Sequence, residues 1–133
     1  MIGFVDAVKM FYARYTDFGS RSARAEFWWV QLFYLIMLII LAIPAVMFSS
    51  SSGEPSLLAL LPLIIFVVVG VIPMVALQIR RFHDQDKSGW FLLLSFIPYV
   101  GGFIVLIFML IAGTRGPNRF GEDPLGYDPD TFS

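Results

Sequence analysis

Long apolar stretches separated by short polar segments form the pattern of this sequence. No charged residue occurs from Phe27 to Phe48 or from Leu57 to Ile79, and a third apolar stretch runs from Trp90 to Ala112. A helix of about 22 residues is long enough to cross a hydrocarbon core of about 30 Å. The pattern therefore predicts an all-α, multi-pass membrane protein with three transmembrane helices, at 27–48, 57–79 and 90–112, in a single domain of residues 1–133.

The third apolar stretch contains a break signal. The segment "IPYVGG" at 97–102 places Pro98 and two glycines in its middle, a combination that interrupts helices. The stretch is either one kinked span or a re-entrant hairpin that enters the membrane and returns. We take the kinked span, broken at Pro98–Gly102, as the working prediction, and Asp86 and Ser88 are suited to cap its start. Three spans place the polar tail, 113–133, on the outer side, whereas a hairpin returns it to the cytoplasm.

The first 16 residues repeat with helical period. Their apolar side chains fall within a stripe about 120° wide at about 100° per residue. This predicts an amphipathic helix at 1–16 that lies in the membrane interface. The same stripe could instead pack on the body of the protein, and both interpretations can hold together. The stripe consists of Phe4, Val5, Val8, Phe11, Tyr12 and Tyr15.

Composition supports the membrane interpretation. The chain is 58% hydrophobic and 14% charged, against about 25% charged in an average soluble domain. A net charge of −1 gives no basic field for nucleic acid. Cysteine is absent, which excludes disulfides and thiolate metal sites, and a single histidine makes a zinc site a poor match. We expect no metal, no cofactor and no nucleic-acid partner.

Basic residues indicate the orientation, because cytoplasmic loops are enriched in them. We call the segment before the first span the leader. With three spans, the leader and the loop after the second span place seven basic residues on one side of the membrane, and the tail places two on the other. The sequence therefore predicts a cytoplasmic N-terminus. The residues counted are Lys9, Arg14, Arg21 and Arg24 in the leader, Arg80, Arg81 and Lys87 in the loop, and Arg115 and Arg119 in the tail.

Two of the leader's arginines are candidates for anion binding. Arg21 and Arg24 are three residues apart, so on a helix they would share a face and could bind a phosphate in bidentate fashion. They could equally determine topology and form an ion pair with Glu26 or Asp84. The predicted cytoplasmic surface, a candidate lipid-headgroup or partner site, comprises Arg21, Arg24, Glu26, Arg80, Arg81, His83 and Asp84.

The stretch "RRFHDQDKSGW" at 80–90 holds the only histidine. His83 titrates near neutrality, so it could act as a general base or a pH-sensitive contact. Adjacent side chains on a helix point about 100° apart, so His83 and Asp84 do not automatically form a pair. They could instead tie the connector to neighbouring helix ends.

The tail contains a possible anion loop, "GTRGPNRFGEDP" at 113–124. Its glycines expose backbone N–H groups beside Arg115, Asn118 and Arg119, an arrangement that can cradle an anion. The loop lacks the spacing of a P-loop or dinucleotide fingerprint, so nucleotide binding is weakly supported.

Three stretches, "GSRSARAEFWW" (19–29), "RRFHDQDKSGW" and "GTRGPNRFGEDP", together with the "IP-x-x-G" break, resemble the signatures of a bacterial inner-membrane family catalogued as domain of unknown function 805. The resemblance covers nearly the whole chain and departs at Ser20, where the family often has Gly or Arg. It implies a multi-pass protein of the bacterial inner (plasma) membrane without an established activity. The matching positions are Arg21, Arg24, Glu26, Trp28, Arg81, His83, Asp84, Ser88, Gly89, Trp90, Asn118, Gly121, Asp123 and Pro124.

Three functions remain open. The first is a non-enzymatic module that binds a partner membrane protein or anionic lipid at its cytoplasmic face. The second is a homo-oligomeric channel or transport accessory, in which Pro62, Gly70 and Pro73 would be flexible or close-packed points, although the spans carry no ionisable residue. The third is a lipid-headgroup-modifying enzyme that uses His83 and Asp84.

Overall fold

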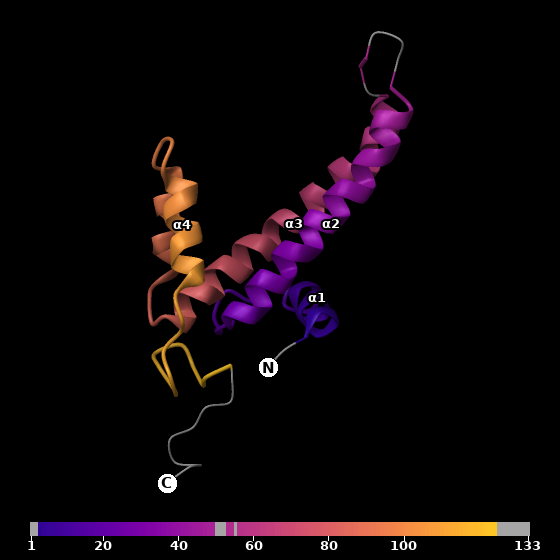
Figure 1. Ribbon diagram of the computed structural model, residues 1–133. Helices are drawn as coiled ribbons and strands as arrows, with labels where there is room; N and C mark the ends of the chain where they lie inside the picture. The colour runs from indigo at the N-terminus through magenta and orange to yellow at the C-terminus, as the bar shows by residue number, and fades with distance from the viewer. Residues whose placement is uncertain (1–2, 50–52, 55, 125–133) are drawn as a thin grey trace.

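The computed structural model describes residues 3–49, 53–54 and 56–124, and its regular elements there are all helical (Figure 1). The elements are α1 (Phe4–Ala13), α2 (Arg24–Met47), α3 (Leu57–Asp84), the 3₁₀ helix η1 (Gly89–Phe96) and α4 (Gly101–Leu110). α2 and α3 run side by side as a long antiparallel pair, while η1 and α4 leave the same end in a different direction. Residues 125–133 of the predicted tail lie outside the described residues.

Two helices, α2 and α3, are long and apolar enough to cross a membrane by length and composition. α3 continues past the apolar stretch that ends at Ile79 and includes Arg80–Asp84. Half of the predicted connector is therefore the last turns of a helix. This is consistent with the high helix propensity of arginine, and it fixes the directions in which those side chains point.

The third apolar stretch is folded as a helical hairpin, which corrects the working prediction of one kinked span. η1 and α4 pack together around a turn at 97–100 (Figure 1). Gly101 is required at this turn, because a Cβ there would come within 2.5 Å of the Leu94 carbonyl oxygen. At about 15 Å, a helix as short as α4 covers only half of a hydrocarbon core.

Helix α1 packs on the antiparallel pair through its apolar stripe. Ala7 and Phe11 are fully buried, and the Phe11 ring meets that of Tyr34 at 5.6 Å. The Tyr15 hydroxyl, just beyond the helix, donates to the Val69 carbonyl at 2.6 Å. Val5 departs from the predicted stripe and is 60% exposed. The stripe thus contacts α2 and α3, while the position of α1 in a membrane interface stays a prediction.

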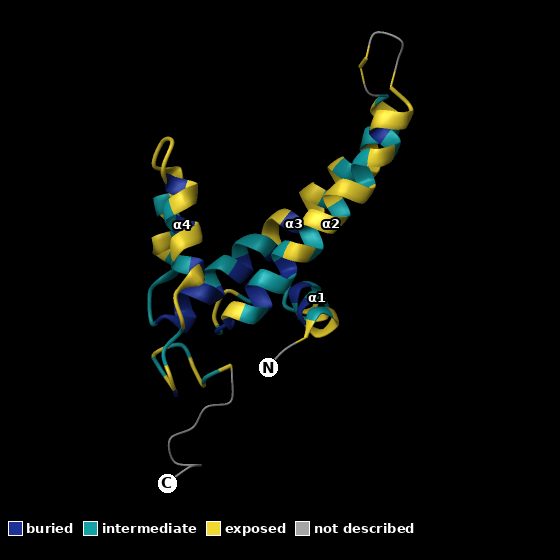
Figure 2. Ribbon diagram, in the orientation of Figure 1, coloured by how far each residue is buried: buried dark blue, intermediate teal, exposed yellow. Residues whose placement is uncertain are grey.

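Buried residues gather at one end of the molecule, where α1, the start of α2, the end of α3 and the hairpin meet (Figure 2). Farther along, α2 and α3 contact each other but expose apolar side chains on their other faces. The hydrophobic core is therefore small, and it lies directly beside the polar end of the chain.

Candidate functional site

Charged and polar side chains are buried at the end where α2 begins and α3 ends. Arg80 and Arg81 are fully buried, and the other members are no more than 8% exposed. Burying charge is costly unless each group is paired and hydrogen-bonded, so the arrangement has to be closely matched. We call this group the polar junction, and it consists of Arg21, Ser22, Glu26, Arg80, Arg81, Asp84 and Gln85.

Asp84 binds two arginines at once. Its Oδ1 accepts from Arg21 Nη2 at 2.9 Å and from Arg21 Nε at 3.1 Å, and its Oδ2 accepts from Arg81 Nη1 at 2.7 Å. Gly113 passes directly against this carboxylate, and a Cβ at that position would collide with it. Such charge-assisted bonds are among the strongest available to a protein.

Arg80 ties the leader to α3. Its Nη2 lies 3.4 Å from Glu26 Oε1, and its Nε donates to Ser22 Oγ at 2.7 Å. Its Nη1 donates to the Arg14 and Asp17 carbonyl oxygens at 3.1 and 3.0 Å. Arg80 is therefore one of several residues that hold the segment between α1 and α2 on α3, together with Arg21, which pairs with Asp84, and Arg81, which donates to the Ser22 carbonyl.

Donors from α2 and α3 bind the carbonyl oxygens at the end of α4, residues 108–111. The last carbonyls of a helix have no partners within the helix and carry partial negative charge, which favours cationic donors. Arg81 Nη2 donates to Met109 at 3.1 Å and to Ile111 at 2.7 Å. The other donors are Trp28 Nε1 to Met109 (3.2 Å), Arg24 Nη1 to Leu110 (3.2 Å) and Gln85 Nε2 to Phe108.

The tail after α4 returns to the polar junction. Arg21 donates to the Thr114 and Gly116 carbonyl oxygens at 2.6 and 2.7 Å, and the Thr114 N–H donates to the Asp84 carbonyl at 2.6 Å. The described part of the tail, which ends at residue 124, therefore contacts the leader's Arg21, as the re-entrant alternative predicts. This contact follows from the hairpin, which brings the chain back to the end it left.

The predicted anion loop binds groups of the chain itself. The Gly116 N–H donates to the Asp123 carboxylate at 3.0 Å, and Asn118 Nδ2 donates to the His83 carbonyl at 2.9 Å. Arg119 Nε forms an exposed pair with Asp86 Oδ1 at 3.1 Å. Arg115 is exposed.

His83 and Asp84 are not partners. His83 Nδ1 lies 3.1 Å from the Ser20 carbonyl oxygen, and its ring stacks on Phe120 at 3.8 Å with an interplanar angle of 3°. Asp84 instead binds the two arginines. The adjacent side chains therefore point to different surroundings, as their helical spacing suggests.

The structure separates Arg21 from Arg24. α2 begins at Arg24 after Ala23, so the two arginines do not share a helix face, and no side-chain cap stands at that helix start. Ser88 does cap η1, accepting from the Trp90 N–H at 3.2 Å.

Sequence reasoning missed several members of the site. They lie within the three polar stretches quoted from the sequence. Their contacts join positions far apart in the chain, so local residue spacing does not predict them. The missed residues are Ser22, Gln85, Gly113 and Phe120.

Two carboxylates outside the apolar helices have shifted acidities. Burial tends to raise the pKa of Asp17, but bonds from the Ser20 hydroxyl and from the Gly19 and Ser20 N–H groups hold it below its ordinary value. Desolvation also tends to raise the pKa of Asp86. The hydrogen bonds and positive charge of Arg119 outweigh this effect, so the pKa of Asp86 is lowered as well. Both groups are ionised near neutral pH.

A small cavity lined by both charged and small residues opens beside the polar junction. It has a volume of about 210 Å³ and lies between the first turn of α2 and the segment after α4. Among the described residues, no group of three or more His, Cys, Asp or Glu side chains is placed to hold a metal ion. The residues that line this cavity include Arg24, Ala25, Asp84, Gly113, Arg115 and Asp123.

Comparison with known proteins places this architecture among membrane proteins. Residues 15–122 match the family described as "Protein of unknown function (DUF805)". The chain is similar to inner membrane protein YhaH of Escherichia coli K12, with 37% identity over 112 residues, 83% of this chain and 88% of the relative. It is also similar to inner membrane protein YhaI of the same strain, with 38% identity over 110 residues, 83% of this chain and 87% of the relative. No solved structure matches the chain.

Proposed function

The chain belongs to the DUF805 family of small inner-membrane proteins, and from that premise we propose that it is a multi-pass, non-enzymatic module that binds anionic lipid headgroups at its cytoplasmic face. The proposed contact is the cavity of about 210 Å³ beside the polar junction, which we call the headgroup pocket. The single observation that carries the proposal is that this pocket is lined by Arg24 and Arg115, two exposed arginines from opposite ends of the chain.

The distribution of basic residues supports the orientation. All nine lie on the side where α2 begins and α3 ends, because the hairpin returns Arg115 and Arg119 to that side. The far end of the α2–α3 pair carries Glu54 and no basic residue. Basic residues retained on the cytoplasmic side favour a cytoplasmic polar junction, with the leader and the described tail on the same side.

Not every predicted arginine is available for a ligand. Arg21, Arg80 and Arg81 are buried and use their donors on Asp84, Glu26 and backbone carbonyls. Arg24 is exposed and donates through Nη1 to the Leu110 carbonyl, and within residues 3–49, 53–54 and 56–124 its guanidinium has no other hydrogen bond that would keep it from a ligand. The phosphate-binding pair expected from sequence is therefore better assigned to Arg24 and Arg115.

The electrostatics of the headgroup pocket suit an anion. Four arginines surround two carboxylates, since Arg21 and Arg81 neutralise Asp84 while Arg24 and Arg115 face Asp123. The N-terminus of α2 adds partial positive charge without a side-chain cap. A negatively charged phosphate group at the membrane surface would match this surplus of positive charge.

The other two functions draw less support from the contacts. An enzyme that uses His83 and Asp84 together would require the two side chains to converge, and they contact different partners. In the α2–α3 pair Gly70 allows the close approach of the Tyr34 side chain and Pro73 is buried, so both act in helix packing.

Binding to defined lipids tests the proposal. Purified protein in detergent is titrated with phosphatidylglycerol, phosphatidylethanolamine or inorganic phosphate, and binding is followed by native mass spectrometry. We expect a preference for phosphatidylglycerol that falls roughly 30-fold in the double variant Arg24→Gln/Arg115→Gln, from about 1 kcal/mol per basic residue. The matched control, Lys9→Gln/Lys87→Gln, removes the same charge away from the pocket and should keep the preference.

Two outcomes would reject the proposal. Equal losses in both double variants would indicate a diffuse charge effect instead of a pocket. Full displacement of the lipid by inorganic phosphate at similar concentration would assign the pocket to free phosphate.

Sidedness has its own test. The chain has no cysteine, so single cysteines can replace Lys9, Glu54 and Arg115. Cysteines at 9 and 115 should be protected from an impermeant thiol reagent in intact cells, and the one at 54 should react. Labelling of 115 without 9 would show that the tail crosses the membrane.

A further inference from the structure

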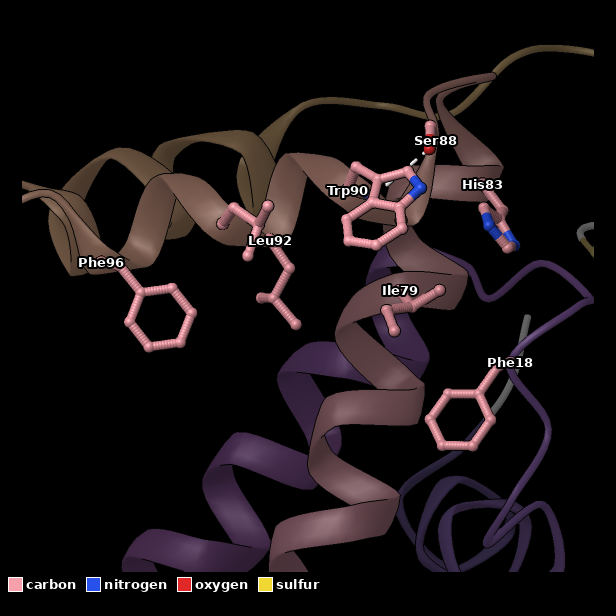
Figure 3. A pocket seen from close by; sticks show the side chains of 9 residues that line it. Phe18, Ile79, His83, Ser88, Trp90, Leu92 and Phe96 are labelled. Atoms are coloured by element: carbon pink, nitrogen blue, oxygen red, sulfur yellow. Dashed lines mark hydrogen bonds between the residues drawn. The ribbon is translucent and has the colours of Figure 1, made fainter.

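A second and larger cavity lies in the corner between α3 and η1. It has a volume of about 470 Å³, within the range of small-molecule sites. Most of its lining is apolar, and Figure 3 shows Ile79 of α3 between Phe18 on one side and the side chains of η1 on the other. His83 and Ser88 lie together on the side of the cavity where the chain turns from α3 into η1. We call this cavity the corner cavity.

The 3₁₀ geometry of η1 forms one wall of the corner cavity. A 3₁₀ helix has three residues per turn, so positions i, i+3 and i+6 lie in one column, and runs longer than three or four residues are uncommon. In the eight residues of η1 this column is Trp90, Leu93 and Phe96, and all three line the cavity. They are 77%, 54% and 78% exposed.

The other faces of η1 are only partly covered by protein, and none of its eight residues is buried. Phe91 stacks on Phe82 of α3 at 5.9 Å, and Leu92 and Leu94 pack against the core. η1 is therefore packed against the protein and not detached, and the column carries its most exposed apolar side chains.

The corner itself is fixed by a close approach. A Cβ at Gly89 would come within 2.9 Å of Ile79 Cγ2, so glycine lets η1 start directly against α3. Ser88 caps that start. The cavity is therefore built by fixed elements on two sides.

We propose that the corner cavity binds one acyl chain of a membrane phospholipid, with the polar headgroup beside His83 and Ser88. An apolar hollow with its polar groups on one side matches the polarity of an amphiphile. The hollow opens beside α3, a helix apolar enough to span a membrane, where the surrounding solvent is lipid and not water. Trp90 stands near the polar side, as aromatic rings do at headgroup level.

This proposal does not rest on the headgroup pocket. His83 lines the corner cavity and Asp84 lines the headgroup pocket, and these adjacent side chains diverge from the end of α3. The corner cavity recognises the chain of a lipid, so it should accept phosphatidylethanolamine as well as phosphatidylglycerol.

Photocrosslinking tests the proposal on the wild-type protein. The protein is incorporated into nanodiscs that contain about one molar equivalent of a phospholipid with a diazirine in its acyl chain, and crosslinked peptides are mapped by mass spectrometry. We expect crosslinks to concentrate on residues 89–96 and near Phe18. Crosslinks spread evenly over the exposed faces of α2, α3 and α4 would overturn the proposal.

A cavity-filling substitution sharpens the test. Leu93→Trp should lower the crosslink yield at residues 89–96 roughly tenfold, because overfilling a packed site displaces its occupant. Leu106→Trp is the matched control, since Leu106 is a similarly exposed leucine of α4 that does not line the cavity. Should Leu93→Trp fail to fold, the wild-type map still decides the question.

Two further outcomes separate the alternatives. Chain-to-chain crosslinks through residues 89–96, with no lipid adduct there, would assign the column to a second copy of the chain and reject the lipid. In Arg24→Gln/Arg115→Gln the adduct at residues 89–96 should persist, so that loss of anionic preference alone counts only against the headgroup pocket.

Discussion

The two halves of the α2–α3 pair have opposite burial patterns. At the polar junction, Arg80 and Arg81 are fully buried, whereas along the rest of the pair Ile39 is 59% exposed and Val68 is 63% exposed (Figure 2). In water both patterns would be unfavourable. With lipid around the apolar half, only the charged half has to be shielded by protein. The core is consequently concentrated where the charges are.

Removing Asp84 should break the charged half most severely. Asp84→Ala leaves Arg21 and Arg81 buried without their shared carboxylate, and loss of one partner of a buried pair costs about 3–5 kcal/mol. We expect the free energy of unfolding in detergent, measured by circular dichroism during denaturant titration, to fall by that amount.

Asp86→Asn is the control, because Asp86 is also paired with an arginine, but at the surface, and asparagine tolerates the positive φ of 58° at this position. It should leave the unfolding midpoint unchanged. Equal effects of the two substitutions would mean that the polar junction does not stabilise the fold.

The exposed apolar half can be tested by adding a charge. Ile39→Lys places an ammonium near the middle of α2, where membrane insertion should become less favourable by about 3 kcal/mol. The measurement is the fraction of α2 inserted in a glycosylation-based insertion assay. Val5→Lys, at an equally exposed site on α1, should cost little. Similar behaviour of both variants would show that exposure along α2 does not mean contact with lipid.

The comparison also explains what could be read from sequence. The two spans follow from uninterrupted apolar length, a local property, and α2 and α3 lie where that length predicts. The break at "IPYVGG" was also visible, but the choice of a hairpin depends on contacts such as Arg81 with Met109, which join distant segments. Local sequence patterns do not show which of these long-range contacts form, so they cannot decide between a hairpin and a kinked span.

The site divides in the same way. The polar stretches that form the junction were identified, and the pairing of a leader arginine with Asp84 was one of the open alternatives. The sequence does not show which arginine pairs with Asp84 and which stays exposed, because Arg21 and Arg24 differ only in lying before or within the first turn of α2. That one-turn difference buries one guanidinium and leaves the other at the headgroup pocket.

Gly113→Ala should perturb the polar junction without removing a charge. The added methyl group would collide with the Asp84 carboxylate, and overpacking of this kind costs about 1–3 kcal/mol. Gly102→Ala, in α4 with open space around its Cα, should instead stabilise by about 0.5–1 kcal/mol. Thermal unfolding in detergent compares the two. An unchanged unfolding temperature in Gly113→Ala would mean that the Asp84 side chain can move away from the added methyl group.

The smallest expected effect concerns the link between α2 and the end of α4. Trp28→Phe removes one hydrogen bond to the Met109 carbonyl and should reduce the free energy of unfolding by about 0.5–1.5 kcal/mol. Because that bond holds the end of α4, amide hydrogen exchange should quicken in α4 more than in α3. Trp90→Phe, at an exposed ring, should change neither quantity. Faster exchange spread evenly over α3 and α4 would mean that the hairpin and the α2–α3 pair unfold as one unit, and that this bond does not stabilise the end of α4 separately.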